Sequence, residues 1–186
     1  MLITLIPRHR AIDKRSLPVG ADNAALVGTS YEVLACIKSG DFASLSQIVH
    51  PARGLLFSPY ATIAEGSAKT FSPAEVMAFG EDKNVYVWGV YDGSALPISL
   101  TPREYFAEFV LDCDYAARAG IVGVNRTVRT GNSLENMAEV RPEVRYVEFH
   151  IPPESDGADW RSLRLGFEEF NGFLMLSVIL HSENTV

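Results

Sequence analysis

The C-terminal part of the sequence carries the pattern that most constrains the fold. Two segments, 160–169 and 173–181, flank the tetrad Phe170-Asn171-Gly172-Phe173. Asn-Gly adopts the positive φ angles that a two-residue type I′ turn requires, and such turns join antiparallel strands. The sequence therefore predicts a long β-hairpin, and the rest of the chain must supply a sheet and a core around it.

The turn also predicts the register of this hairpin, because side chains alternate between the two faces of paired strands. Counting back from the turn gives the partners Phe170 and Phe173, Arg164 and Ile179, and Ser162 and His181. One face is wholly apolar and is predicted to be core: Leu163, Leu165, Phe167, Leu174, Leu176, Val178 and Leu180. The other face is mixed, and three settings fit it, namely solvent, a cavity wall or a subunit contact: Trp160, Ser162, Arg164, Glu168, Met175, Ser177, Ile179 and His181.

Helical spacing dominates the first part of the chain, where residues 22–50 predict two consecutive helices. Asp22 is a favourable N-cap, apolar residues then recur at helical intervals, and Gly40 supplies a stop. Asp41 begins a second, short helix, which ends before Pro51 because proline disfavours helical geometry in the residue preceding it.

Two capping-box patterns predict further helices. Ser72 is followed three residues later by Glu75, and Thr101 by Glu104, each with a proline at the first helical position. The first of these helices is short. The second has a clear apolar face and is predicted as one continuous helix that ends near Gly120.

The order of elements predicts an α+β fold. Strand-like segments occur at 55–57, 85–91, 121–129 and 144–151. Helices that precede a mainly antiparallel sheet in the sequence typically pack on one face of that sheet, and the two layers enclose one hydrophobic core. We therefore expect one domain over residues 21–186, preceded by an irregular arm over residues 1–20 that contains prolines and no clear period.

Two phrases of the sequence, "GDFASLSQIVHP" and "WRSLRLGFEEFNGFLMLSVILH", resemble members of the NTF2-like superfamily (nuclear transport factor 2 type). This resemblance implies a cone, in which a strongly bent, mainly antiparallel sheet packs against three N-terminal and central helices and leaves a pocket between them. The pocket would hold a small molecule. Some NTF2-like enzymes isomerise, dehydrate or cyclise a substrate with an acid or base in that pocket.

A closer resemblance is to an uncharacterised bacterial family whose members are often exported or lipid-anchored. It rests on the phrases "HPARGLLFSPY", "VWGVYDGSALPISLTPREYF", "VRYVEFHIP" and "DWRSLRLGFEE", which together extend over roughly residues 40–181. The resemblance implies family membership and an accessory role at the cell envelope. It brings no catalytic residues with it.

Charge and the N-terminus limit partners and compartment. The chain has 16 basic and 23 acidic residues, a net charge of −7, which argues against a duplex nucleic-acid partner because such proteins need a basic surface. Its apolar runs are too short for a transmembrane helix. The apolar stretch at the start precedes the basic residues, the reverse of a secretory signal. We expect a cytoplasmic protein, or an exported one if the true start lies upstream.

Seven residues are candidates for a binding site: Tyr60, Trp88, Asp112, Tyr146, His150, Arg164 and His181. Aromatic residues line small-molecule pockets but also fill cores. Asp112 lies on the flank of an apolar helix face, where a carboxylate either borders the core or reaches into a pocket. The two histidines either face solvent or line a polar wall. Arg164 either binds an anion or forms a cross-strand ion pair.

These observations favour a noncatalytic module that binds a small molecule or a protein partner. The alternative is an NTF2-like isomerase, dehydratase or cyclase that uses a pocket carboxylate or histidine. Spacings typical of zinc ligands and of nucleotide-binding loops are missing from the sequence, so we expect no metal and no cofactor. A homodimer is expected, because the mixed hairpin face, with Trp160, Met175 and Ile179, suits a two-fold contact.

Overall fold

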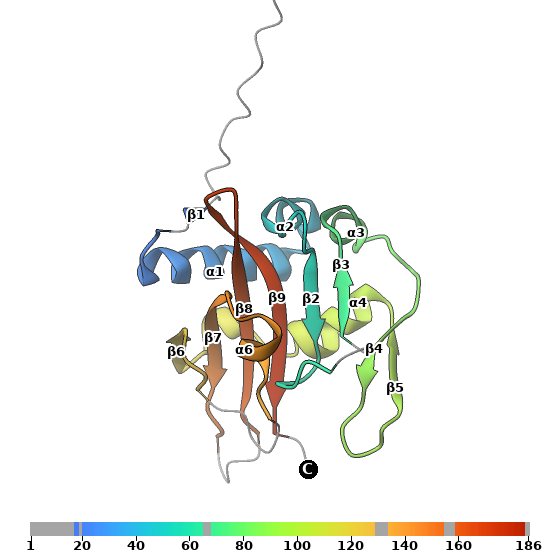
Figure 1. The fold of residues 1–186 in the computed structure, drawn as a ribbon. Helices are drawn as coiled ribbons and strands as arrows, with labels where there is room; N and C mark the ends of the chain where they lie inside the picture. Colours follow the sequence, from blue (N-terminus) through green and yellow to red (C-terminus); the bar gives the residue numbers. More distant parts are fainter. Residues whose placement is uncertain (1–16, 19, 65–67, 129–133, 155–158, 185–186) are drawn as a thin grey trace, which may run out of the picture.

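The computed structural model describes residues 17–18, 20–64, 68–128, 134–154 and 159–184 (Figure 1). Its helical segments are α1 (Asn23–Ser39), α2 (Phe42–Ile48), α3 (Pro73–Ala78), α4 (Pro102–Tyr105), the π-helical turn η1 (Phe106–Val110), α5 (Tyr115–Arg118) and α6 (Met137–Val140). Its strands are β1 (Leu17–Pro18), β2 (Leu55–Ser58), β3 (Lys69–Phe71), β4 (Tyr86–Val90), β5 (Pro97–Leu100), β6 (Ile121–Val124), β7 (Arg145–Ile151), β8 (Arg161–Phe170) and β9 (Phe173–Glu183).

The fold is α+β, as predicted, with a mixed sheet at its centre. The main sheet has the order β3-β2-β9-β8-β7-β6, and β1 pairs with the turn-proximal end of β9. Neighbouring strands are antiparallel except β2 and β9, which run parallel. Strands β4 and β5 form a separate two-stranded sheet beside β2 and β3 (Figure 1).

Local capping signals placed the helix starts correctly. The Asp22 carboxylate accepts a hydrogen bond from the backbone N–H of Ala25 at 2.8 Å, and Gly40 ends α1 in the left-handed conformation with φ 68°. Both capping boxes form, at Ser72 before α3 and at Thr101 before α4. These predictions hold because a cap depends only on residues within one turn.

The continuous helix expected from Pro102 to near Gly120 is wrong. After α4 the chain widens into η1, where the N–H of Leu111 donates to the carbonyl of Phe106, five residues back, at 2.6 Å. The helix then breaks, and Asp114 caps the separate helix α5 by accepting from the N–H of Ala117 at 3.2 Å. An aspartate side chain can accept a hydrogen bond from a nearby backbone N–H, and this bond competes with the backbone hydrogen bonds that would continue the helix.

The hairpin turn is confirmed, but the predicted register fails beyond it. Phe170 pairs with Phe173 as expected. A bulge then leaves Ser177 as the extra residue on β9, so that Arg164 faces Leu180 and Ser162 faces Ser182. Gly166 lies at this irregularity, where a Cβ atom would come within 2.8 Å of a Val144 methyl group, and glycine in a strand often marks such a bulge.

The one-residue shift exchanges side chains between the faces of β9. Val178 and Leu180, predicted to lie with Leu163, instead join a second cluster under α6. His181 and Ile179 move to the face that carries Leu163 and Leu165, which packs against α1 and the α4–η1 segment. The expected apolar face is therefore divided between the two sides of the sheet.

Both faces of the hairpin are covered by the chain itself. Trp160 and Ile179, assigned to the mixed face, are 0% and 1% exposed, and of the proposed dimer contact only Met175 is partly exposed. The second face of the sheet, which carries Val178 and Leu180, packs under α6, and α6 lies on the opposite side of the sheet from α1 (Figure 1). Two of the three residues expected at a dimer contact thus belong to the interior of this chain.

The expected N-terminal arm falls mostly outside the described residues. Leu17 and Pro18 form β1, opposite Leu174 and Phe173. Within the part of the chain that the structure describes, no helix is long and apolar enough to span a membrane.

Candidate functional site

The structure separates the seven candidate residues into four places. Tyr60 lines a surface pocket. Trp88 lies in the aromatic core, with no exposed surface. Asp112 and His181 meet on the helix-facing side of the sheet. The three remaining residues occupy the opposite side: Tyr146, His150 and Arg164.

Trp88 is held by core contacts. Its ring stacks on Tyr105 with centroids 3.9 Å apart, and its indole N–H donates to the carbonyl of Leu100 at 2.8 Å. Phe57 and Phe71 meet the same ring. The residue therefore joins the β4–β5 sheet to the main core, and none of its surface is open to a ligand.

Asp112 and His181 are brought together by the helix break and the strand bulge. An Oδ atom of Asp112 lies 2.7 Å from the Arg161 guanidinium and 3.6 Å from Nε2 of His181, and Tyr115 donates its hydroxyl to the other oxygen at 2.9 Å. Burial raises the pKa of Asp112, but contacts with His181, Tyr115 and Arg161 lower it by more, so that the pKa lies below its ordinary value.

The His181 ring has both nitrogens directed at protein atoms. Nδ1 lies 3.0 Å from the carbonyl oxygen of Pro59, which can only accept, so Nδ1 carries a hydrogen. Nε2 is buried and faces the Asp112 carboxylate. This arrangement ties the end of β9 to the turn after β2 and to the helix break, and it leaves neither nitrogen directed at a ligand.

On the other face, Arg164 forms a buried ion-pair network. Its guanidinium donates to Glu148 at 2.8 and 3.2 Å and to Glu135 at 2.9 Å, and it lies 4.8 Å from the Tyr146 ring centroid. Arg164 and Glu148 are 1% and 0% exposed. Of the two interpretations offered for Arg164, the structure contains the cross-strand ion pair, with Glu148, and this pair is buried.

His150 is also engaged within the second face. Its Nδ1 lies 2.8 Å from the hydroxyl of Ser162, its cross-strand neighbour, and its ring is 5.9 Å from that of Trp160. The residue is 3% exposed. His150 is thus interior and bonded to protein, and it does not face solvent.

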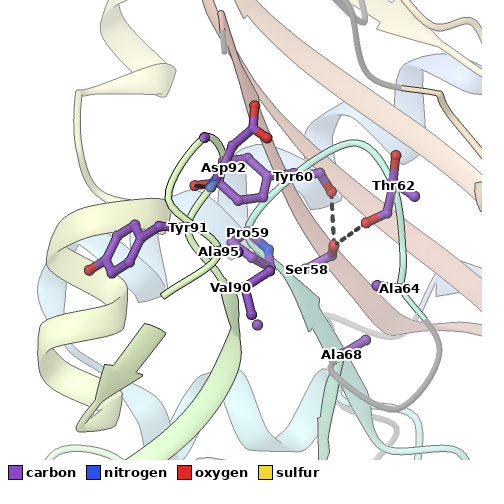
Figure 2. Close-up of a pocket in the computed structure, with 12 residues that line it drawn as sticks. Ser58, Pro59, Tyr60, Thr62, Ala64, Ala68, Val90, Tyr91, Asp92 and Ala95 are labelled. Atoms are coloured by element: carbon purple, nitrogen blue, oxygen red, sulfur yellow. Dashed lines mark hydrogen bonds between the residues drawn. The ribbon is translucent and has the colours of Figure 1, made fainter. Parts of the chain in front are cut away.

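The pocket at Tyr60 is open and has a volume of about 300 Å³. One wall of the pocket is formed by the end of β2 and the segment that follows it. The opposite wall is formed by the end of β4 and the β4–β5 connection. Figure 2 shows Ser58, Pro59 and Thr62 on one wall and Val90, Asp92 and Ala95 on the other. The lining is Ser58, Pro59, Tyr60, Thr62, Ala64, Ala68, Gly89, Val90, Tyr91, Asp92, Gly93 and Ala95.

Local sequence builds this pocket. The Ser58 hydroxyl lies within hydrogen-bond distance of the carbonyls of Tyr60 and Thr62, at 2.8 and 3.2 Å, and so curls the chain after β2 (Figure 2). Gly89 has φ 152° in a β4 irregularity, and a Cβ there would lie 3.2 Å from the ring of Pro59. Glycine thus allows β4 to pass close to the end of β2.

Tyr60 connects the two walls of the pocket. Its hydroxyl accepts from the N–H of Asp92 at 3.3 Å, and its ring packs edge-on against Phe109. Burial raises the pKa of Tyr60, the Asp92 N–H lowers it, and the nearby charges of Glu183, Asp92 and Glu108 raise it further. The net pKa lies above its ordinary value, so the phenol is neutral at physiological pH.

A second pocket of about 300 Å³ lies where α1 meets the helix break. Leu34, Val110 and Leu111 give it an apolar wall, and the ion pair of Lys38 with Asp114 lies at its lining. Cys113 also lines it. Burial, followed by the charge of Asp112, raises the pKa of this thiol to about 11, so Cys113 is a poor nucleophile.

Of the residues that line the first pocket, the sequence singled out only Tyr60 as a binding candidate, and it placed residues 89–91 in the expected strand over 85–91. Asp92-Gly93 signals a turn, and Ser58-Pro59 signals a strand end, but nothing in either pattern says that the two face each other. Comparisons with protein-family models, with curated proteins and with solved structures find no match to this chain. The site is therefore interpreted from its own geometry.

Proposed function

We propose that this protein is an NTF2-like, noncatalytic module that binds a small molecule in the pocket at Tyr60. The observation that carries the proposal is this pocket of about 300 Å³, with aromatic, small apolar and polar groups on facing walls. Pockets of this size and mixed character are the usual sites of small-molecule binding. The helices that cover one face of a mainly antiparallel sheet support the superfamily assignment.

The placement of the acid–base candidates supports binding over catalysis. Asp112, His150 and His181 are each bonded to or in close contact with other protein groups, and none of them lines either of the two pockets described. A general acid or base must come within hydrogen-bond reach of its substrate. The enzyme alternative would need a rearrangement that frees one of these groups.

A binding experiment with one blocking variant tests the proposal. A library of small organic fragments is screened by ligand-observed NMR against the protein and against Val90→Trp, which places an indole in the pocket lining. Val87→Trp is the matched control, because Val87 lies on the same strand with 48% exposure, against 49% for Val90, and does not line the pocket.

We expect a set of fragments that bind the wild-type protein and Val87→Trp but not Val90→Trp. Fragments that bind Val90→Trp as tightly as the wild-type protein would contradict the proposed site, and so would a library in which no fragment binds. The homodimer stays a prediction, and sedimentation velocity over a range of concentrations checks it.

A further inference from the structure

Negative charge lies at one side of the proposed pocket, and none of its described lining residues carries a positive charge. Asp92 lines the pocket, Glu108 accepts a hydrogen bond from the Tyr91 hydroxyl at 2.8 Å, and Glu183 acts electrostatically on Tyr60. Among the described residues, these three carboxylates take part in none of the ion pairs. The twelve lining residues include no lysine, arginine or histidine.

Three carboxylates in the interior of the protein are each paired with an arginine, unlike the acids at the pocket. Asp112 pairs with Arg161, Glu148 with Arg164, and Glu168 lies 2.8 Å from Arg53. Within the described part of the chain, Asp92 and Glu108 form no ion pair, and Arg161, the cross-strand neighbour of Glu183, is paired with Asp112 instead. An entering anion would meet repulsion there, whereas a cation would gain attraction that screening reduces but does not abolish at a short distance.

The pocket also supplies surfaces suited to an organic cation. Tyr60 and Tyr91 both belong to its lining, and a cation over a tyrosine face is attracted by the ring quadrupole. Pro59, Val90 and Ala95 add apolar surface for the body of the ligand. The volume of about 300 Å³ suits a small molecule and not a peptide segment.

We propose that the ligand of this pocket is a small organic cation, an amine or quaternary ammonium compound that carries an apolar or aromatic group. The inference rests on the proposed function and adds the chemical class of the ligand. The apolar part contacts Pro59 and Val90, and the charged nitrogen lies toward Asp92 and Tyr60.

Three probes of the same size separate charge from shape: benzylammonium, benzyl alcohol and benzoate. Each is titrated into the protein at low salt, and affinity is read from amide chemical-shift changes. We expect benzylammonium to bind at least about threefold more tightly than benzyl alcohol, a ratio of the order that a cation–π contact at an exposed site supplies. Benzoate is expected to bind more weakly than either.

The variant Asp92→Asn should bring the benzylammonium affinity toward that of benzyl alcohol and leave the alcohol unchanged. Glu32→Gln, at an exposed position of α1, which contributes no residue to the pocket lining, is the matched control and should change neither affinity. Equal affinities for benzylammonium and the alcohol would overturn the charge inference while the binding module stands. Binding of none of the three probes would also overturn the inference, and the Val90→Trp screen then decides the proposed function separately.

Discussion

Removal of the Arg164 side chain should destabilise the protein more than an ordinary core substitution. In Arg164→Met, Glu148 keeps its place on the second face of the sheet with 0% exposure but loses both guanidinium contacts, at 2.8 and 3.2 Å. Leaving one partner of a buried ion pair unpaired typically costs about 3–5 kcal/mol. Such a loss is a large part of the ~5–15 kcal/mol that stabilises a typical domain.

Urea unfolding followed by circular dichroism measures the loss, and a double variant identifies its cause. In Arg164→Met with Glu148→Leu no charge is left buried at this pair, so the free energy of unfolding should return to within about 1 kcal/mol of the wild type. If Arg164→Met does not fold, Arg164→Lys keeps the charge, loses the two-pronged contact and should show a smaller loss. A cost below about 1 kcal/mol for Arg164→Met, or a double variant less stable than the single one, would refute the reasoning.

Three further predictions concern backbone, pH and thiol chemistry. Gly54→Ala should destabilise the protein several times more than Gly172→Ala in thermal unfolding. Both glycines have positive φ, but only at Gly54 would a Cβ meet a backbone oxygen, that of Phe71, at 2.5 Å. Equal losses of stability would contradict this reasoning. The lowered pKa of Asp112 means that its carboxylate stabilises the fold above its ordinary pKa of 3.8 and that this contribution disappears as pH falls through the lower, folded pKa. The stability difference between wild type and Asp112→Asn, from urea unfolding at several pH values, should therefore be full at pH 6 and shrink below about pH 4; a difference that stays constant down to pH 2 would argue against it. In a Cys36→Ser background, Cys113 should react with iodoacetamide at pH 8 on the order of a hundredfold more slowly when folded than in urea, because its pKa rises from 9.0 to about 11; equal rates, followed by mass spectrometry, would show that the thiol is not masked.

The sequence predicted those parts of the fold that depend on a few neighbouring residues. The Asp22 cap, the two capping boxes and the Asn171-Gly172 turn are each decided within one turn of chain, and all four form. The α+β class followed from the order of these elements. Local chemistry of this kind is readable because its partners lie three or four residues apart.

Prediction failed where a single residue changed the geometry. One extra residue at Ser177 moved His181 to the other face of the sheet, where it meets Asp112. A type I′ turn fixes the register only as far as the next bulge. Gly166 is a residue type that often marks a bulge, but the alternation of side chains does not show whether a bulge forms there. The helix break before Asp114 was missed for a similar reason. The helical spacing of apolar residues continues across the break, so the spacing alone predicted one helix.

The candidate site was less predictable than the fold. Its walls come from the turn after β2 and from the β4–β5 connection, about thirty residues apart in the chain, and they meet only because Gly89 passes close to Pro59. Tyr60 drew notice as an aromatic residue near a turn. Trp88, another aromatic candidate, lies in the core, so composition could not tell Tyr60 and Trp88 apart.

A map of amide chemical-shift changes during titration with benzylammonium tests the central claim most directly. The account predicts the largest changes at residues 58–64 and 89–95, and no saturable change when the same titration is made with Val90→Trp. Changes that cluster instead around Asp112 and His181, or that stay linear with probe concentration everywhere, would contradict a small-molecule site at Tyr60.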